Sequence, residues 1–200
     1  MKMYKILFVL IAILTIRCDT IPAEIAEEIE KTILTEHEIN SLLHMREEEM
    51  LAHDVYSYFS GLYDIPVFSN IARSELVHTG RVKELINKYG LEDPAADHEP
   101  GVFEDAGIQE LYNALTRKGK VSYEEAVVVG LTIEDLDIAD LEMALETEVN
   151  NEDIVEVYNF LLMGSKHHMN AFYFHAQSNE IEYIPQYISL DHFLEIVEKD

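Results

Sequence analysis

The sequence predicts an all-α protein built around a bundle of four long helices, with one long crossover connection between the second and third helices. Apolar residues recur at steps of three and four along four separate segments, which is the spacing of one helix face. Gly and Pro are few, 8 and 5 among 200 residues, so long stretches can be helical without a break. No segment alternates apolar and polar residues for long, so we expect little or no sheet. The bundle is expected over residues 35–178.

Residues 1–17 are predicted to be a signal peptide. Positive charge at Lys2 and Lys5 precedes an apolar run, residues 6–16, that is too short to span a bilayer comfortably. The run leads to Cys18, and because this is the only cysteine, no intrachain disulfide can form. The surrounding residues resemble the lipid-attachment box of bacterial lipoproteins, except that an arginine precedes the cysteine where a small residue is usual. We expect an exported protein at the cell envelope, lipid-anchored through Cys18, with a periplasmic or secreted protein and an uncleaved anchor as alternatives.

The first long helix follows a tether. Residues 18–34 are expected to form this tether, with a short acidic helical stretch at residues 23–34. Thr35 and Glu38 then form a capping-box pattern, in which each side chain can bind the other residue's backbone N–H. The helix that they begin should run to about Leu62.

The second helix and the long connection come next. Asp64-Ile65-Pro66 should end the first helix, because proline removes a backbone donor. Ser69 is the expected N-cap of the second helix, which should end at Gly90. Residues 91–121 are punctuated by Pro and Gly and form the expected crossover, with one short amphipathic helix at about residues 108–117.

Two further helices complete the bundle. Ser122 and Glu125 form another capping-box pattern, which begins a third helix to about Glu148. Asn151, followed by acidic residues in the first turn, suits the start of a fourth helix that continues to about Ala176. The remaining tail, residues 179–200, is expected to pack on the bundle and to end in a short helix.

The strongly negative charge limits the partners of this chain. Its formal net charge is −25, and residues 1–17 hold three basic residues and no acid, so the rest carries 11 basic against 39 acidic side chains. Such a chain repels nucleic acid and anionic lipid. We therefore expect no nucleic-acid partner, and membrane contact only through the N-terminal segment. An acidic surface suits a soluble protein and attracts metal cations, and it leaves self-association into an oligomer open.

Each of the four long segments carries a metal-ligand side chain midway along its apolar face. In the second segment, Glu75 and His78 lie one helical turn apart, so both can bind one metal ion. A charged acid on an apolar seam costs several kcal/mol unless something compensates it. The matching positions of the other three segments hold Glu49, Glu134 and His168.

Three carboxylates and two imidazoles in one core predict a buried dinuclear metal site. Three buried carboxylates without cations would protonate or destabilise the fold, whereas two divalent cations offset their repulsion. Carboxylates with some imidazole suit iron or manganese, and zinc is an alternative. Taken singly, each residue has a simpler explanation. A Glu on a seam often faces water, a core His is usually hydrogen-bonded, and Glu48 could face inward in place of Glu49.

The pattern resembles that of ferritin-like di-metal carboxylate proteins, which place a Glu on each of two helices and a Glu-x-x-His on each of the other two. Glu49 with Tyr56 seven residues later resembles the first helix of rubrerythrins and bacterioferritins. Ser165 departs from the pattern, since it occupies the place of the fourth-helix Glu. The remaining set is similar to the Glu, Glu-x-x-His, Glu, His ligands of manganese catalases. Asp137, one turn after Glu134, is a candidate substitute for the missing acid.

Supporting roles follow from the same resemblance. Glu75 and Glu134 are the expected bridging carboxylates. Tyr56 could donate a hydrogen bond or supply an electron, or could simply pack in the core with its hydroxyl bound to a carboxylate. Ser165 and His175 are expected to contact the ligands without binding metal.

Longer stretches resemble an uncharacterised ferritin-like family of bacteria and archaea, a domain of unknown function. The resemblance covers roughly residues 40–190 and rests on HMREEEMLAHDVY, SELVH, GLTIEDLDIADLE, NEDIVEVYNFLLMGSKHHMNAF and YIPQYIS. It implies the fold and metal binding, and it supplies no established reaction.

Three functions fit these observations. The first is an oxidoreductase with two iron or manganese ions, of the peroxidase, catalase or ferroxidase type, acting on peroxide, dioxygen or ferrous iron. The second is a non-catalytic metal-binding or iron-storage protein. The third is a structural or interaction bundle whose polar seam residues only fix helix register.

Overall fold

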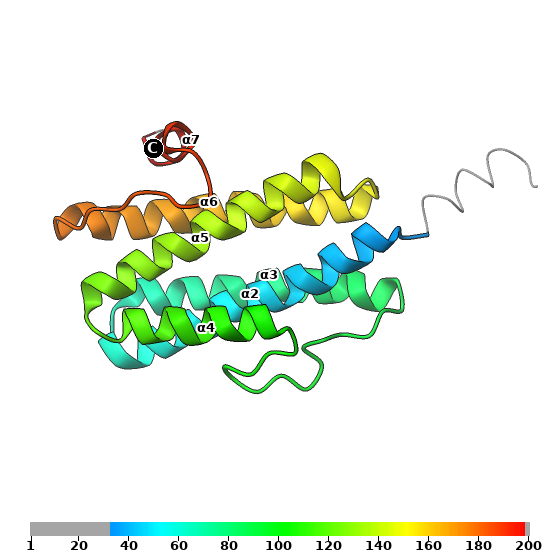
Figure 1. The fold of residues 1–200 in the computed structure, drawn as a ribbon, viewed down its shortest axis with the longest axis horizontal. Helices are drawn as coiled ribbons and strands as arrows, with labels where there is room; N and C mark the ends of the chain where they lie inside the picture. Colours follow the sequence, from blue (N-terminus) through cyan, green and yellow to red (C-terminus); the bar gives the residue numbers. More distant parts are fainter. Residues whose placement is uncertain (1–32, 199–200) are drawn as a thin grey trace, which may run out of the picture. The chain divides into compact units, whose positions relative to one another are not determined.

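The computed structural model describes residues 33–198, and these form six helices and no strand (Figure 1). The all-α prediction is confirmed for this part of the chain, in which no helix is long and apolar enough to cross a membrane. The signal peptide, Cys18 and nearly all of the tether lie outside the described residues, and Ile33 and Leu34, at the end of the expected acidic stretch, are not helical. The helices are α2 (Glu36–Tyr63), α3 (Pro66–Lys88), α4 (Ala106–Gly119), α5 (Tyr123–Thr147), α6 (Glu152–Ser178) and α7 (Leu190–Val197).

The four long helices pack as two helical hairpins. α2 packs against α3 and α5 packs against α6, and the two hairpins meet through contacts of α3 with α6 and of α2 with α5. Figure 1 shows the two pairs as two layers, with α4 alongside α2. Short links join the helices of each pair, whereas a long segment that contains α4 joins α3 to α5. Side chains on the inner faces of all four long helices therefore share one interior.

The capping box of Thr35 and Glu38 forms as predicted and also ties the two hairpins together. The Thr35 hydroxyl accepts a hydrogen bond from the Glu38 N–H at 3.2 Å, and Glu38 Oε2 accepts one from the Thr35 N–H at 2.8 Å. The other Glu38 oxygen accepts hydrogen bonds from the backbone N–H groups of Asn150 and Asn151, at the start of α6. Burial alone would favour the neutral acid, but these hydrogen bonds lower the pKa of Glu38 to about 2.

α3 begins earlier than the sequence predicted. Pro66 occupies its first turn and Ile65 its N-cap position, so the prediction of Ser69 as N-cap is wrong. Proline is well suited to the first helical position, because its missing N–H would have no partner there and its φ is already helical. The Ser69 hydroxyl instead donates to the Pro66 carbonyl at 3.2 Å. The preceding helix ends as expected, at Asp64, whose φ of 51° is left-handed.

The segment between α3 and α5 is held by buried polar side chains of α2. Glu47 accepts hydrogen bonds from the backbone N–H groups of residues 104 and 105, which lead into α4. Arg46 forms an ion pair with Asp93 at 2.9 Å. Asp54 accepts a hydrogen bond from the backbone N–H of Gly101, which lies in the same segment. These three side chains are therefore structural, although their charges lie on a helix that also carries a predicted ligand.

The C-terminal segment packs against α5 and α6. Asp135 of α5 is fully buried, and its carboxylate accepts hydrogen bonds from the Tyr183 hydroxyl and from the backbone N–H groups of residues 186–188. In α7, the ring of Phe193 is buried against Tyr173 of α6 and against Tyr183. This segment therefore covers part of the outer surface of the second hairpin.

Two clusters of buried apolar side chains lie along the four long helices, with a polar layer between them. On α2, Leu42 belongs to one cluster and Phe59 to the other, and Glu49 lies between them. α6 runs in the same direction as α2 and shows the same order, from Leu161 in the first cluster to Phe172 in the second. The polar layer is therefore enclosed at both ends by packed apolar core.

Candidate metal centre

Five side chains from four helices build the polar layer. Their relative exposure ranges from 1% to 8%, so all five are buried. Helical spacing on an apolar seam had predicted that they face the interior, and the structure brings all of them together. They are Glu49 of α2, Glu75 and His78 of α3, Glu134 of α5 and His168 of α6.

Glu75 lies between the two imidazoles. Its Oε2 is 2.7 Å from Nδ1 of His78, and its Oε1 is 2.7 Å from Nδ1 of His168. The two rings are nearly parallel, with centroids 5.3 Å apart and an angle of 25° between their planes. One oxygen for each imidazole is the arrangement that a carboxylate needs in order to bridge two ions.

Each imidazole also has a carboxylate of its own. Nδ1 of His78 lies 3.3 Å from Glu49 Oε2, and Nδ1 of His168 lies 3.6 Å from Glu134 Oε2. The five residues therefore divide into two sets. Each set holds one imidazole nitrogen, one carboxylate of its own and one oxygen of Glu75. Glu75, His78 and His168 each offer one ligand atom, and these three atoms lie within 4.8 Å of one another.

Several ligand atoms of this layer lack hydrogen bonds. Nδ1 of His78, Nδ1 of His168 and Oε1 of Glu49 are buried and make no hydrogen bond of acceptable geometry. More than nine in ten buried polar groups are paired, and an unpaired one costs about 1–3 kcal/mol. The Glu75 oxygens and the imidazole nitrogens are 2.7 Å apart but are not aligned as donor and acceptor. This arrangement is the one expected of two ligands that point at the same metal ion. The donor set therefore fits a metal cluster.

The buried acids and imidazoles of the layer shift one another's pKa values. Burial raises the pKa of Glu49 to about 8 and also raises the pKa of Glu134. Burial would raise the pKa of Glu75 too, but the two imidazoles lower it to about 2. The carboxylates outweigh burial at the imidazoles and raise the pKa of His78 to about 11 and that of His168 to about 10. Protons therefore neutralise the acids here, and a divalent ion can take the place of those protons.

Tyr56, Ser165 and Asp137 border the layer as the sequence suggested. The Tyr56 hydroxyl donates to Glu134 Oε1 at 2.5 Å. The Ser165 hydroxyl donates to Asp137 Oδ2. The other Asp137 oxygen is buried without a hydrogen bond, and burial with the charges of Glu49 and Glu134 raises the pKa of Asp137 well above its usual value. Asp137 is therefore buried beside the layer with one oxygen that makes no hydrogen bond.

His175 lies apart from the layer. Its Nδ1 is 2.7 Å from the Tyr123 hydroxyl, and its ring packs against Tyr123 and Phe174. His175 lies seven residues, about two turns, beyond His168, in the part of α6 where Phe172 and Ala176 belong to the neighbouring apolar cluster, so a shared helix face does not bring it to the ligands. The His175 ring thus contacts Tyr123 and Phe174, and neither of these is a predicted metal ligand.

Two residues that sequence reasoning missed position the imidazoles. The Ser74 hydroxyl lies 2.9 Å from His168 Nε2, which fixes the ring so that Nδ1 faces Glu75. At Gly164, a Cβ atom would lie 2.4 Å from Cε1 and Nε2 of His78, so only glycine leaves room for this ring. Neither residue binds metal in proteins as Glu or His does. The one available signal was their position, each directly beside a residue of the polar seam.

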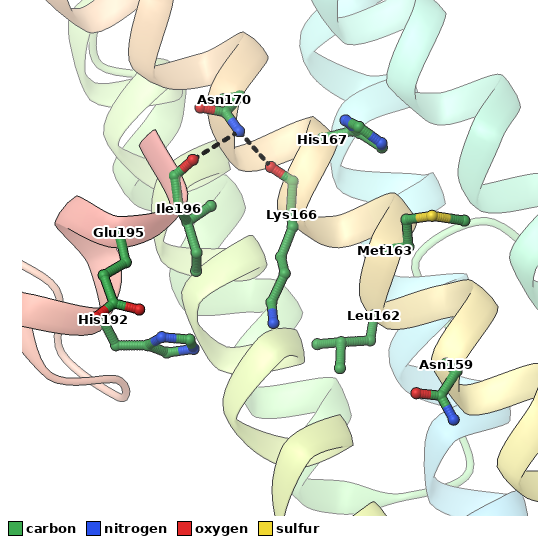
Figure 2. A pocket seen from close by; sticks show the side chains of 9 residues that line it. All are labelled: Asn159, Leu162, Met163, Lys166, His167, Asn170, His192, Glu195 and Ile196. Carbon is green, nitrogen blue, oxygen red and sulfur yellow. Dashed lines mark hydrogen bonds between the residues drawn. The ribbon is translucent and has the colours of Figure 1, made fainter. Parts of the chain in front are cut away.

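A groove of about 420 Å³ lies between α6 and α7, away from the buried layer (Figure 2). Figure 2 shows Asn170 of α6 joined by hydrogen bonds to the carbonyls of Lys166 and Ile196. Lys166 and His192, on opposite sides, both bind Glu142, at 2.7 and 3.0 Å. None of the five predicted ligands lines this groove. It is a surface feature separate from the candidate metal centre.

Comparison with known proteins assigns the family. Residues 38–200 match the family model described as Uncharacterized protein domain (DUF2202). The chain belongs to this family. Uncharacterized protein MJ0754 of Methanocaldococcus jannaschii is 42% identical over 174 residues, which cover 87% of this chain and 94% of that protein. The crystal structure of hypothetical protein MJ0754 from Methanococcus jannaschii DSM 2661 matches with a TM-score of 0.82 and 43% identity, over 84% of this chain and 95% of that chain.

Membership in DUF2202 confirms the expected resemblance to a domain of unknown function. The relative with a solved structure is archaeal, so the comparison gives no support to the bacterial source that the lipid-attachment box implied. The names of these matches mention no ferritin-like protein, manganese catalase or rubrerythrin, and no reaction or signal peptide. What DUF2202 membership adds is a fold shared with a solved structure.

Proposed function

We propose that this protein holds two iron or manganese ions in a non-haem centre, with zinc as the alternative metal. Glu49, Glu75, His78, Glu134 and His168 would be the ligands. The observation that carries the proposal is Glu75, whose two oxygens each lie 2.7 Å from an imidazole Nδ1 that makes no hydrogen bond. Three buried carboxylates with two imidazoles form a donor set that suits these metals.

We further propose that the fold is ferritin-like. Two helical hairpins joined by a long segment between the second and third long helices support this assignment. So does the Glu-x-x-His pair on the second long helix, together with one carboxylate on each of the first and third. Ser165 in place of the fourth-helix Glu is the departure, and its bond to Asp137 supports that aspartate as an additional ligand.

Within the proposed centre, Glu75 would be shared by both ions, because each of its oxygens lies beside a different imidazole, and each other ligand would hold one ion. Glu134 is a less suitable bridge than the sequence suggested, because its Oε1 accepts the Tyr56 hydroxyl and only Oε2 faces His168. The Ser74 hydroxyl contacts Nε2 of His168, the ring nitrogen that does not face Glu75. The ligands bind metal in their deprotonated forms, so loading the centre should release protons.

We infer that the activity is that of an oxidoreductase acting on peroxide, dioxygen or ferrous iron. Bound iron or manganese would supply the one-electron redox steps of such a reaction. Tyr56 lies within hydrogen-bond distance of a proposed ligand, and its hydroxyl can hold or pass a proton at Glu134 Oε1. A non-catalytic metal-binding or iron-storage protein is the alternative. On the N-terminal sequence alone, we place either one at the cell envelope, anchored through Cys18 or free of the membrane.

Metal content and turnover test this proposal. Protein from cells supplied with iron and manganese should carry about two ions per chain. The double variant Glu75→Gln, His168→Ala should lose the two ions of the buried centre. Breakdown of hydrogen peroxide and oxidation of ferrous iron, measured on the same samples, should be present in the natural protein and lost in the variant. Two ions without turnover would favour the storage alternative, and unchanged metal content in the variant would remove both metal hypotheses.

The matched controls lie on the same two helices. Glu84→Gln changes an exposed carboxylate of α3, and His167→Ala changes the exposed neighbour of His168 on α6. Both should keep the metal and the activity of the natural protein. Helix content measured by circular dichroism shows whether each variant is folded.

A further inference from the structure

A second group of metal-ligand side chains lies outside the candidate centre. His44 and Glu48 are four residues apart on α2 and so share one helix face, and Asp140 reaches the same point from α5. His44 Nε2 is 3.6 Å from Glu48 Oε2 and 3.7 Å from Asp140 Oδ2. Each residue offers one ligand atom, and these three atoms lie within 4.8 Å of one another.

Glu48 is the independent sign that this group binds something. Its relative exposure is 3%, yet its Oε2, the atom facing His44, makes no hydrogen bond. A surface cluster of acids would be satisfied by water, whereas Oε2 of Glu48 is buried without a hydrogen bond.

The other two members of the group are open to solvent. His44 and Asp140 line a surface pocket of about 330 Å³ between α2 and α5. An ion held by these three side chains would keep positions open to water on the pocket side. Such a site can take up an ion from solution and release it again, unlike the enclosed layer behind it.

Carboxylates lead from this group toward the polar layer. Asp137 lies one turn before Asp140 on α5 and is buried, and one of its oxygens makes no hydrogen bond. Glu48 and Glu49 are also consecutive in the chain. Asp140, Glu48, Asp137 and Glu49 therefore form a series of acids from the surface pocket to the interior.

We propose that His44, Glu48 and Asp140 bind a divalent first-row transition-metal cation and that this site passes ions to the buried centre. One imidazole with two carboxylates suits manganese, ferrous iron or zinc. The binding of a cation at this site is independent of the proposed function. The passing of ions inward rests on the proposed function, since it needs a centre to load.

Titration of the metal-free protein with Mn²⁺, followed by the electron paramagnetic resonance signal of the free ion, tests the site. The natural chain should bind about three ions, and the variant His44→Ala, Asp140→Asn about two. The variant Glu75→Gln, His168→Ala should keep about one ion, at the proposed site. Equal stoichiometry of the natural chain and the His44→Ala, Asp140→Asn variant would overturn the site. Two bound ions that survive loss of Glu75 and His168 would instead count against the buried centre.

His37→Ala is the matched control, because His37 is exposed and lines the same pocket without belonging to the group. It should bind as many ions as the natural chain, and a loss of one ion there would overturn the assignment to His44. Both exchanged residues of the test variant are partly exposed, so the fold should persist, which circular dichroism checks.

The rate of loading tests the second half of the proposal. With Mn²⁺ in excess, the His44→Ala, Asp140→Asn variant should fill the buried centre to the same final level but about tenfold more slowly, as read by metal content after timed chelation. A loading rate equal to that of the His37→Ala control would overturn the role in passing ions inward and leave the binding site standing.

Discussion

Gly164 of α6 lies directly against the imidazole of His78 of α3. A Cβ atom at Gly164 would be 2.4 Å from both Cε1 and Nε2 of that ring, which is far inside van der Waals contact. The other ring nitrogen, Nδ1, faces Glu75 and Glu49. The close approach of the α6 backbone therefore sets how far the imidazole reaches into the polar layer. A residue without a side chain positions a proposed ligand.

Gly164→Ala should push the His78 ring out of place while leaving the helices folded. Overpacking of this kind lowers the free energy of unfolding by about 1–3 kcal/mol, and displacement of a ligand should weaken metal binding about tenfold or more. Urea unfolding and metal titration measure the two effects. Gly80→Ala on α3 is the control, because nothing lies within 4 Å of its Cβ position, and it should stabilise the protein by about 0.5–1 kcal/mol. Equal metal affinity in both variants would contradict the positioning role.

Tyr56→Phe should destabilise the protein without unfolding it. The change removes the hydroxyl that donates to Glu134 Oε1 and leaves that oxygen buried without a donor. The free energy of unfolding should fall by about 1–3 kcal/mol in the metal-free protein. Tyr58→Phe, at the exposed neighbouring position, should change it by less than about 0.5 kcal/mol. Thermal unfolding of both variants measures the difference, and a Tyr56→Phe protein as stable as the natural one would show that Glu134 does not need this donor.

The consecutive acids Glu47, Glu48 and Glu49 should have different functions, which substitutions at Glu47 and Glu49 can distinguish. Glu47→Ala removes the acceptor for the backbone N–H groups of residues 104 and 105, so it should cost about 1–3 kcal/mol and speed amide hydrogen exchange in that segment. Its metal content should not change. Glu49→Ala should have the reverse effect, with normal exchange at residues 104 and 105 and loss of bound metal. Metal loss in Glu47→Ala, in a folded protein, would mean that the structural and ligand roles were assigned to the wrong acids.

The sequence was sufficient for the four long helices and for the members of the polar layer. Helical periodicity is local, so an acid or imidazole at the right step of an apolar seam can be placed in the interior without knowing its neighbours. Glu75 with His78, one turn apart, was the clearest case, and Glu49, Glu134 and His168 followed from the same spacing. The helix starts at Thr35 and Ser122 were predictable for the same reason, because each cap is completed within a few residues.

What the sequence could not supply depends on partners far along the chain. Arg46, Glu47 and Asp135 look like exposed charges on helices, yet all are buried, because their partners lie in connecting segments. No rule of spacing predicts which loop returns to which helix. The error at Ser69 was different in kind, since two helix-start signals competed and proline at the first position prevailed. His175 shows that a residue can follow the seam and still lie beyond the layer.

The metal-free protein should lose stability as the pH rises from about 6 to about 10. The carboxylates raise the pKa of His78 to about 11 and that of His168 to about 10, against burial. The stability from these protons is complete below the ordinary imidazole pKa of 6.5 and is lost as the pH rises through the folded values. Glu49 also makes the protein less stable as the pH rises, because burial raises its pKa to about 8 and the folded state favours its neutral form. Glu75, with a pKa lowered to about 2, has the opposite sign, but its contribution changes only below about pH 4.5.

Urea unfolding of chelator-treated protein at about pH 6, 8 and 10 measures this trend, and added Mn²⁺ should reverse it. The ion binds the deprotonated ligands, so its stabilising effect grows as the protons leave. The Glu75→Gln, His168→Ala variant is the control, since it lacks the carboxylate between the imidazoles and one of the imidazoles themselves. Its stability should depend less on pH and should not respond to Mn²⁺ at the centre. A metal-free natural protein that gains stability between pH 6 and pH 10 would mean that the acids and imidazoles of the polar layer are not coupled as the distances around Glu75 require.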